Sequence, residues 1–134
     1  MEANLDHIVL SVRDMDAMLG FYIVVLGLAP YRVDQYHEGT VLFPSVRLNA
    51  HTIIDLLPPA MWNQGDAQAA TFPNLNHFCI AIDKSHWDPL MLRLQSNDIE
   101  IDSGPMKLSG AEGDGIAIYI HDPDGNQLEI RYYE

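Results

Sequence analysis

The sequence predicts an α+β fold made of two modules in tandem, each with the order strand, helix and three strands. The octet L-D-H-I-V-L-S-V at Leu5–Val12 returns as L-N-H-F-C-I-A-I at Leu75–Ile82. A stripe of apolar residues at helical spacing follows each octet, and each half closes on a strand with one acid, Ile54-Asp55-Leu56 or Leu128-Glu129-Ile130. Because the two octets agree in character at every position, they indicate a duplicated module.

Length and composition describe one globular domain. The chain has 134 residues, of which 48% are hydrophobic and 9% aromatic, as is typical of globular and not of disordered proteins. We therefore expect a single domain over residues 1–134. Module 1 is expected at 4–57, a linker without periodicity at 58–74, and module 2 at 75–134.

The charge of the chain excludes several classes of partner. Seven basic residues against nineteen acidic ones give a formal net charge of -12, which argues against nucleic acid and anionic lipid. No run of about 20 apolar residues predicts a membrane span. The first residues lack the basic and apolar regions of a signal peptide, so we expect a cytoplasmic protein. The charge itself is explained either by solubility or by affinity for metal cations or a cationic ligand.

Strand alternation separates each octet histidine from the bulky residues of its strand. In the first octet, Ile8, Leu10 and Val12 share one face and His7 lies on the other. In the second octet, His77 is separated from the bulky residues in the same way. One face of each strand is thus predicted to be buried under a helix, while the histidine face leaves room for a cavity.

The rest of module 1 is predicted from helical spacing and turn residues. A helix is expected over Met15–Leu26, with Asp14 as its N-cap and Gly27 as its stop. The remaining elements are expected to be strands at Leu28–Gln35, Thr40–Leu48 and His51–Leu57, with a turn at His37–Gly39.

Module 2 repeats this order. Ser85 with Asp88 predicts a capping box, ahead of a helical stripe from Trp87 to Leu94. The single Cys79 is expected to be a small buried hydrophobe. The remaining elements are expected to be a strand at Ile99–Ile101, a loop at Gly104–Gly115, a strand at Ile116–Ile120, a turn at His121–Asn126 and a strand at Gln127–Tyr133.

Four side chains are candidates for a metal site: His7, Asp55, His77 and Glu129. If a pseudo-twofold relates the modules, all four can converge on one point. Two imidazoles and two carboxylates without a thiolate suit a divalent ion such as Ni, Co, Fe, Mn or Zn. A single strand histidine is more often a hydrogen-bonded core or surface residue than a ligand. Its recurrence at equivalent positions, each with a late acid, favours the metal site.

Tyr119 has the parity of the cleft-facing side of its strand, as has His121. Either is a candidate for contact with a ligand or for proton transfer. The alternative for both is a hydrogen bond to the neighbouring turn.

Three segments carry a resemblance to a known family. They are the first octet, F-Y-I-V-V-L-G-L at Phe21–Leu28, and I-Y-I-H-D-P-D-G-N-Q-L-E-I at Ile118–Ile130. The chain resembles the glyoxalase/bleomycin-resistance/extradiol-dioxygenase superfamily, the vicinal oxygen chelate proteins, and is closest in pattern to glyoxalase I-like members. The resemblance implies two βαβββ modules that form an open barrel-like sheet around a metal-binding cleft, and a homodimer.

For the site, the resemblance implies that His7, His77 and Glu129 are metal ligands, with Asp55 in the fourth position. Glyoxalase I enzymes usually carry glutamate there, so the shorter aspartate is a departure from their pattern. For function, it implies a metal-dependent lyase or isomerase like lactoylglutathione lyase, acting on a small substrate with vicinal oxygens. Glu129 or Asp55 is then the catalytic acid or base, with Tyr119 beside them.

Two alternatives stay open. An extradiol-type dioxygenase would use His7, His77 and Glu129 as a two-histidine, one-carboxylate triad on Fe(II). A protein of the bleomycin-resistance type would bind a cationic ligand without metal, which the acidic charge suits. Fosfomycin-type chemistry on a phosphonate is disfavoured, because the sequence shows no evident cluster of basic residues.

Overall fold

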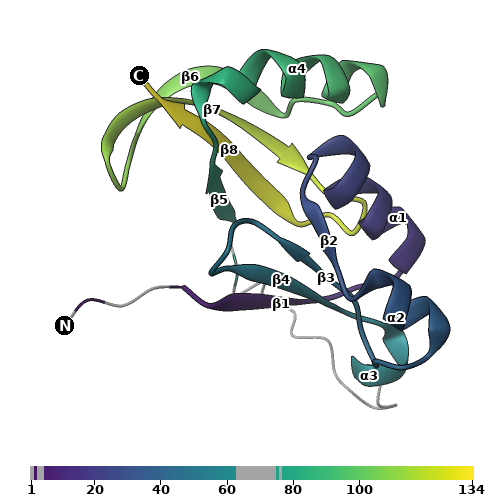
Figure 1. Ribbon diagram of the computed structural model, residues 1–134. Coiled ribbons are helices and arrows are strands. Elements are labelled where there is room, and N and C mark those ends of the chain that lie inside the picture. The colour runs from purple at the N-terminus through teal and green to yellow at the C-terminus, as the bar shows by residue number, and fades with distance from the viewer. Residues whose placement is uncertain (1, 3–4, 63–74, 76) are drawn as a thin grey trace. The chain divides into compact units, whose positions relative to one another are not determined.

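The chain forms two compact units, Met1–Ala69 and Ala70–Glu134, each built on one four-stranded sheet (Figure 1). A computed structural model of the protein describes residues 2, 5–62, 75 and 77–134. The predicted α+β class is confirmed, as is the tandem repeat of strand, helix and three strands, with short helices added.

The first unit contributes the first sheet and its helices. Its elements are β1 (His7–Ser11), α1 (Met15–Leu19), η1 (Gly20–Val25), β2 (Ala29–Tyr31), α2 (Val33–Glu38), β3 (Ser45–Arg47), β4 (Ile53–Leu57) and α3 (Pro59–Trp62). The second unit contributes the second sheet. Its elements are β5 (Phe78–Ala81), η2 (Lys84–His86), α4 (Trp87–Ser96), β6 (Ser103–Gly110), β7 (Gly113–His121) and β8 (Gln127–Tyr133).

The two sheets have the same topology. Their strand orders are β1-β4-β3-β2 and β5-β8-β7-β6. In each sheet the first and last strands of the module pair in parallel, and the other pairs are antiparallel. The duplication seen in the octets therefore extends to the strand order of both halves.

The first helix begins where the sequence predicts. The Asp14 carboxylate accepts a hydrogen bond of 3.0 Å from the Ala17 amide, which makes it the N-cap. Helix α1 continues as the π-helical turn η1, and Gly27 then takes a left-handed φ of 79°. Met18 and Tyr22 are fully buried.

The strands predicted after the first helix are all shorter than expected, slightly for β4 and strongly for the other two. The expected strand at Leu28–Gln35 is β2 alone, because Arg32 adopts a left-handed φ of 60° and helix α2 follows. The expected turn at His37–Gly39 falls at the end of that helix. Of Thr40–Leu48, only β3 is extended. Pro44 precedes β3 and has no amide hydrogen to donate to a sheet.

In the second unit the predicted capping box is wrong. The Asp83 carboxylate, not that of Asp88, accepts hydrogen bonds from the Ser85 amide (2.9 Å) and the Ser85 hydroxyl (2.6 Å). The Trp87 ring then contacts the Tyr132 ring, with 4.8 Å between centroids. This contact places the start of α4 over the face of the second sheet that carries the buried apolar residues Leu128 and Ile130.

Two further expectations in the second unit are wrong. Ile99–Ile101 is not extended strand, and the expected loop at Gly104–Gly115 is the hairpin of β6 and β7. A Cβ on Gly115 would lie 2.5 Å from the Tyr132 carbonyl oxygen. Gly115 is therefore needed because two strands approach closely there, and it does not mark a loop. The final strand β8 has the predicted bounds.

The linker expected at 58–74 begins with α3, whose Trp62 indole donates a 3.0 Å hydrogen bond to the Val12 carbonyl. Residues 63–74 lie outside the described residues. Each helix in the described part of the chain is too short or too polar to cross a lipid bilayer.

Candidate functional site

The two candidate acids occupy equivalent positions in the two sheets. Asp55 of β4 pairs with Val9 of β1, and Glu129 of β8 pairs with Cys79 of β5. Val9 and Cys79 each lie two residues after the octet histidine. Paired residues in a sheet point to the same side, so each acid shares a face with the histidine of its own unit. We call this the donor face of each sheet.

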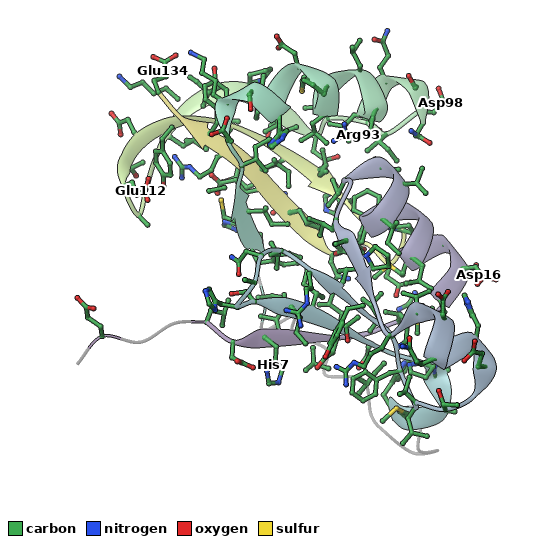
Figure 2. The ribbon with its side chains drawn as sticks, viewed as in Figure 1. His7, Asp16, Arg93, Asp98, Glu112 and Glu134 are labelled. Carbon is green, nitrogen blue, oxygen red and sulfur yellow. The ribbon has the colours of Figure 1, made fainter. Side chains whose placement is uncertain are left out.

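In the first unit His7 lies at the edge of the donor face. Figure 2 shows its side chain projecting from β1, and 47% of that side chain is exposed. Its Nδ1 lies 2.7 Å from Oδ2 of Asp6. The hydrogen bond to the Asp6 carboxylate raises the pKa of His7, and the negative charge of Asp55 acts in the same direction.

Asp55 is buried and already has two partners. The Ser45 hydroxyl on β3 donates to its Oδ1 at 2.5 Å, and Nη2 of Arg32 lies 3.7 Å from the same oxygen. Ile54 and Leu56 are fully buried on the opposite face. The carboxylate is therefore held in place on the donor face by a hydroxyl and a guanidinium.

In the second unit His77, Tyr119 and Glu129 meet. Nε2 of His77 lies 3.4 Å from Oε2 of Glu129, and the Tyr119 hydroxyl donates to the same oxygen at 3.2 Å. The His77 and Tyr119 rings pack edge to face, 5.4 Å apart. Arg131 donates to the other oxygen, Oε1, at 3.2 Å. Three side chains, those of His77, Tyr119 and Arg131, thus converge on the buried Glu129 carboxylate.

Tyr119 remains a hydrogen-bond donor at neutral pH. Burial raises the pKa of its hydroxyl, and the negative charge of Glu129 adds to this. His121, the other candidate on β7, instead pairs its Nδ1 with the carboxylate of Asp102.

Three residues that contact Asp55 or Glu129 were not predicted from the sequence: Arg32, Ser45 and Arg131. Arg131 follows Glu129 by two residues, so strand parity could have found it. Ser45 pairs with Asp55 just as Tyr119 pairs with Glu129. No local signal marks Arg32, because the left-handed turn after β2 brings it to Asp55.

The donor separation that one divalent ion needs can be tested in the second unit. Among the described residues no group of three histidine, cysteine or acidic side chains lies close enough to hold an ion; each unit supplies one imidazole and one carboxylate. Two bonds of about 2.1 Å at a tetrahedral angle span about 3.4 Å. The distance between His77 Nε2 and Glu129 Oε2 is 3.4 Å. The second unit thus presents its two donors at a separation suited to one ion.

Cys79 contradicts its prediction as a buried hydrophobe, because its residue is exposed on the donor face. Partial desolvation by its neighbours raises the pKa of the thiol to about 11, and the negative charge of Glu129 contributes. At pH 7.5 we expect iodoacetamide to modify Cys79 at least roughly tenfold more slowly than a free thiol of pKa about 8.5. A raised pKa leaves a smaller fraction of the thiol as thiolate, and this loss is larger than the gain in nucleophilicity of each thiolate. Mass spectrometry of the time course measures this rate.

The variant Glu129→Gln tests whether the charge of Glu129 contributes to the raised pKa of the Cys79 thiol. Removing the negative charge lowers the pKa of the thiol, so alkylation at pH 7.5 should accelerate. Asp114→Asn, which removes an exposed acid on β7 paired with Lys107, is the matched control and should leave the rate unchanged. Wild-type alkylation as fast as that of the free thiol would contradict the raised pKa.

Comparison with known proteins adds an independent finding. The model of the Glyoxalase/Bleomycin resistance protein/Dioxygenase superfamily matches residues 4–130. The chain is 33% identical to the glyoxalase domain-containing protein RDO1 of Mycosarcoma maydis, over 98% of this chain and 69% of that protein. It is 25% identical to a lactoylglutathione lyase of Neisseria meningitidis, over 92% of this chain and 86% of the lyase.

The structure is also similar to a solved structure. The crystal structure of a glyoxalase/dioxygenase from Nostoc punctiforme superposes with a TM-score of 0.74 at 27% identity, covering 98% of this chain and 91% of that one.

Proposed function

The chain belongs to the glyoxalase/bleomycin resistance protein/dioxygenase superfamily, and from this premise we propose that it is a metal-dependent enzyme acting on a small substrate with vicinal oxygens. The proposed chemistry is that of a lyase or isomerase like lactoylglutathione lyase, with an extradiol-type dioxygenase as its variant. One observation carries the proposal. The acids Asp55 and Glu129 lie at equivalent register positions, each on the same sheet face as its octet histidine.

The proposed metal ligands are His7, Asp55, His77 and Glu129. A bound Ni, Co, Fe, Mn or Zn ion would polarise a substrate oxygen. We further propose that the two units form one domain, with modules at 4–57 and 75–134 joined by the linker 58–74, and that the protein is a cytoplasmic homodimer.

Glu129 or Asp55 is the proposed acid and base, and the surroundings of Glu129 suit this role. Its Oε2 accepts a hydrogen bond from Tyr119 and lies beside His77, while its Oε1 accepts one from Arg131. The hydroxyl and the guanidinium together hold the carboxylate in one orientation. In this proposal the Glu129 carboxylate takes a proton from the substrate and returns it, and Tyr119 orients the carboxylate during the transfer.

A second candidate function is metal-free binding of the bleomycin-resistance type. The supporting observation is that each candidate acid already has an arginine and a hydroxyl as partners. The negative charge of each candidate acid is thus balanced by an arginine without a bound cation.

Metal analysis distinguishes the metal-dependent enzyme from the metal-free binding protein. Protein purified without chelator should retain about one equivalent of a divalent metal per chain and release it below about pH 6, because neutral imidazole is the ligand. Elemental analysis across a pH series measures this. Protein reloaded with each metal is then assayed with the hemithioacetal of methylglyoxal and glutathione, and with catechol. Protein that neither retains nor rebinds metal at neutral pH would favour the binding-protein function.

A further inference from the structure

The first unit contains a polar pocket that the proposed function does not use. We call it the arginine pocket; its volume is about 460 Å³, and it is lined by Asp6, Tyr31, Arg32, Arg47, Ala50, His51 and Ile53. This volume is ordinary for a small-molecule site, which typically spans about 300–1,000 Å³. Two of the seven lysines and arginines of an otherwise acidic chain line it.

The sequence did not predict this pair of arginines, because Arg32 and Arg47 are far apart along the chain. Arg32 and Arg47 come together because β2 pairs with β3. Arg47 pairs with Ala29 on one side and with Ile53 of β4 on the other.

The arginine pocket opens on the donor face. Ile53 pairs with His7, and Ser45 pairs with both Tyr31 and Asp55. These residues all point to one side of the first sheet, because paired residues share a face. A molecule bound at His7 and Asp55 would therefore lie next to the two guanidinium groups.

The Tyr31 ring organises both arginines. The Cζ atom of Arg32 lies 4.6 Å from the ring centroid, and that of Arg47 lies 4.3 Å from it. A guanidinium within about 6 Å of an aromatic centroid is attracted to the ring. Both side chains are thus held before any ligand arrives, which reduces the entropy lost on binding.

Within the described residues, both arginines keep hydrogen-bond donors without a partner. Arg47 donates to the Ala50 carbonyl at 3.5 Å, and among the described residues no carboxylate lies within 4.0 Å of its guanidinium. The buried Nε of Arg32 has no hydrogen-bond partner in the described part of the chain. The acid in the pocket lining, Asp6, is paired with His7.

The backbone at Arg32 also points to a ligand. Its φ of 60° is left-handed, which is uncommon for a residue other than glycine, asparagine or aspartate. Such strained conformations persist where the surrounding structure imposes them, and they cluster at ligand sites. Here the turn places one guanidinium between Asp55 and the pocket.

We propose that the arginine pocket binds an oxyanion, a carboxylate or a phosphate group, carried by the substrate. The planar fork of arginine suits the two oxygens that both groups present. The identification of the anion with the substrate rests on the proposed function, whereas anion binding by the pocket needs no metal. A substrate with vicinal oxygens and an acidic group is the class that this face would select.

The test is a titration of the full chain, labelled with ¹⁵N and free of metal, with inorganic phosphate and separately with acetate. The amide signals of Tyr31, Arg32, Arg47 and His51 are expected to shift in a saturable way with at least one of the two probes. Arg47→Gln should weaken that binding roughly tenfold or more. Arg47→Lys should restore part of it, since it keeps the charge but not the fork.

Lys107→Gln is the matched control, because it removes the same charge from an exposed side chain of the second sheet. It should leave binding unchanged. Saturation with acetate alone identifies a carboxylate site, and with phosphate alone a phosphate site; either supports the proposal. Shifts in neither titration, or equal weakening by Arg47→Gln and Lys107→Gln, would overturn it.

Two readouts keep this test separate from that of the proposed function. The wild-type shifts need no variant, so they decide the matter even if Arg47→Gln unfolds. Metal content is measured on other samples. Anion binding without retained metal would leave the arginine pocket in place and remove the metalloenzyme.

Discussion

The variant His77→Ala is expected to lose its metal while keeping its fold. His77 is proposed as a ligand, and loss even of a residue that supports a ligand typically costs about 10- to 100-fold in metal affinity; we expect at least the upper value here. Its side chain is 32% exposed and contacts Glu129 and Tyr119 on the donor face, opposite the buried apolar residues. Elemental analysis and a thermal melt followed by circular dichroism measure the two effects.

The matched control is His86→Ala. His86 ends the turn η2, is exposed, and makes no side-chain capping bond to α4. Its loss should change neither metal content nor melting temperature by a measurable amount. Near-stoichiometric metal in His77→Ala would eliminate the metal site proposed for this chain.

The variant Asp55→Ala is expected to lower proton-transfer activity more sharply than metal binding, and to weaken metal binding less than His77→Ala does. The Asp55 side chain is shorter than the glutamate usual in glyoxalase I enzymes, and its carboxylate already accepts a hydrogen bond of 2.5 Å from the Ser45 hydroxyl. Removing it also leaves the Ser45 hydroxyl and the nearby Arg32 guanidinium without their acid. We therefore expect a loss of about 1–3 kcal/mol in the free energy of unfolding. Urea unfolding, metal titration and activity assays separate the three effects.

Two further variants at this position sharpen the test. Asp55→Asn keeps an acceptor for Ser45 but removes the charge, so it should retain most of the stability and lose activity. Asp55→Glu reaches about 1.5 Å further and should keep the metal. If Asp55→Ala retains both affinity and activity, Asp55 is structural, and the triad of His7, His77 and Glu129 becomes the better ligand set.

Local signals in the sequence predicted much of the fold. The octets contain β1 and β5, the Asp14 carboxylate caps the first helix, and β8 has its predicted bounds. The failures arise where tertiary contacts decide the backbone. Gly110 and Gly115 look like loop residues, but both lie in the hairpin against Arg131, where a side chain would meet its guanidinium. Helix α2 follows Arg32, whose left-handed backbone conformation is not indicated by any periodicity in the sequence.

The candidate site was predictable to the extent that strand parity governs it. Strand alternation separated His7 and His77 from the bulky residues of their strands, and the register of the structure places Asp55 and Glu129 on the same faces. The arginine partners were not predicted. Arg131 could have been, by its spacing from Glu129. Arg32 approaches Asp55 through a turn whose geometry is not encoded by a recognisable motif.

The parallel pairing of first and last strands also bears on how the protein is made. In each unit the histidine lies at or just before the first strand and the acid on the last, and these two strands are neighbours at one edge of the sheet. Contacts so distant along the chain require a long loop to close, and they form late in folding. During synthesis β1 stays without its sheet partner β4 until β4 has emerged, and β5 stays without β8 in the same way. The donor pair of each half is therefore assembled by the step that completes its sheet.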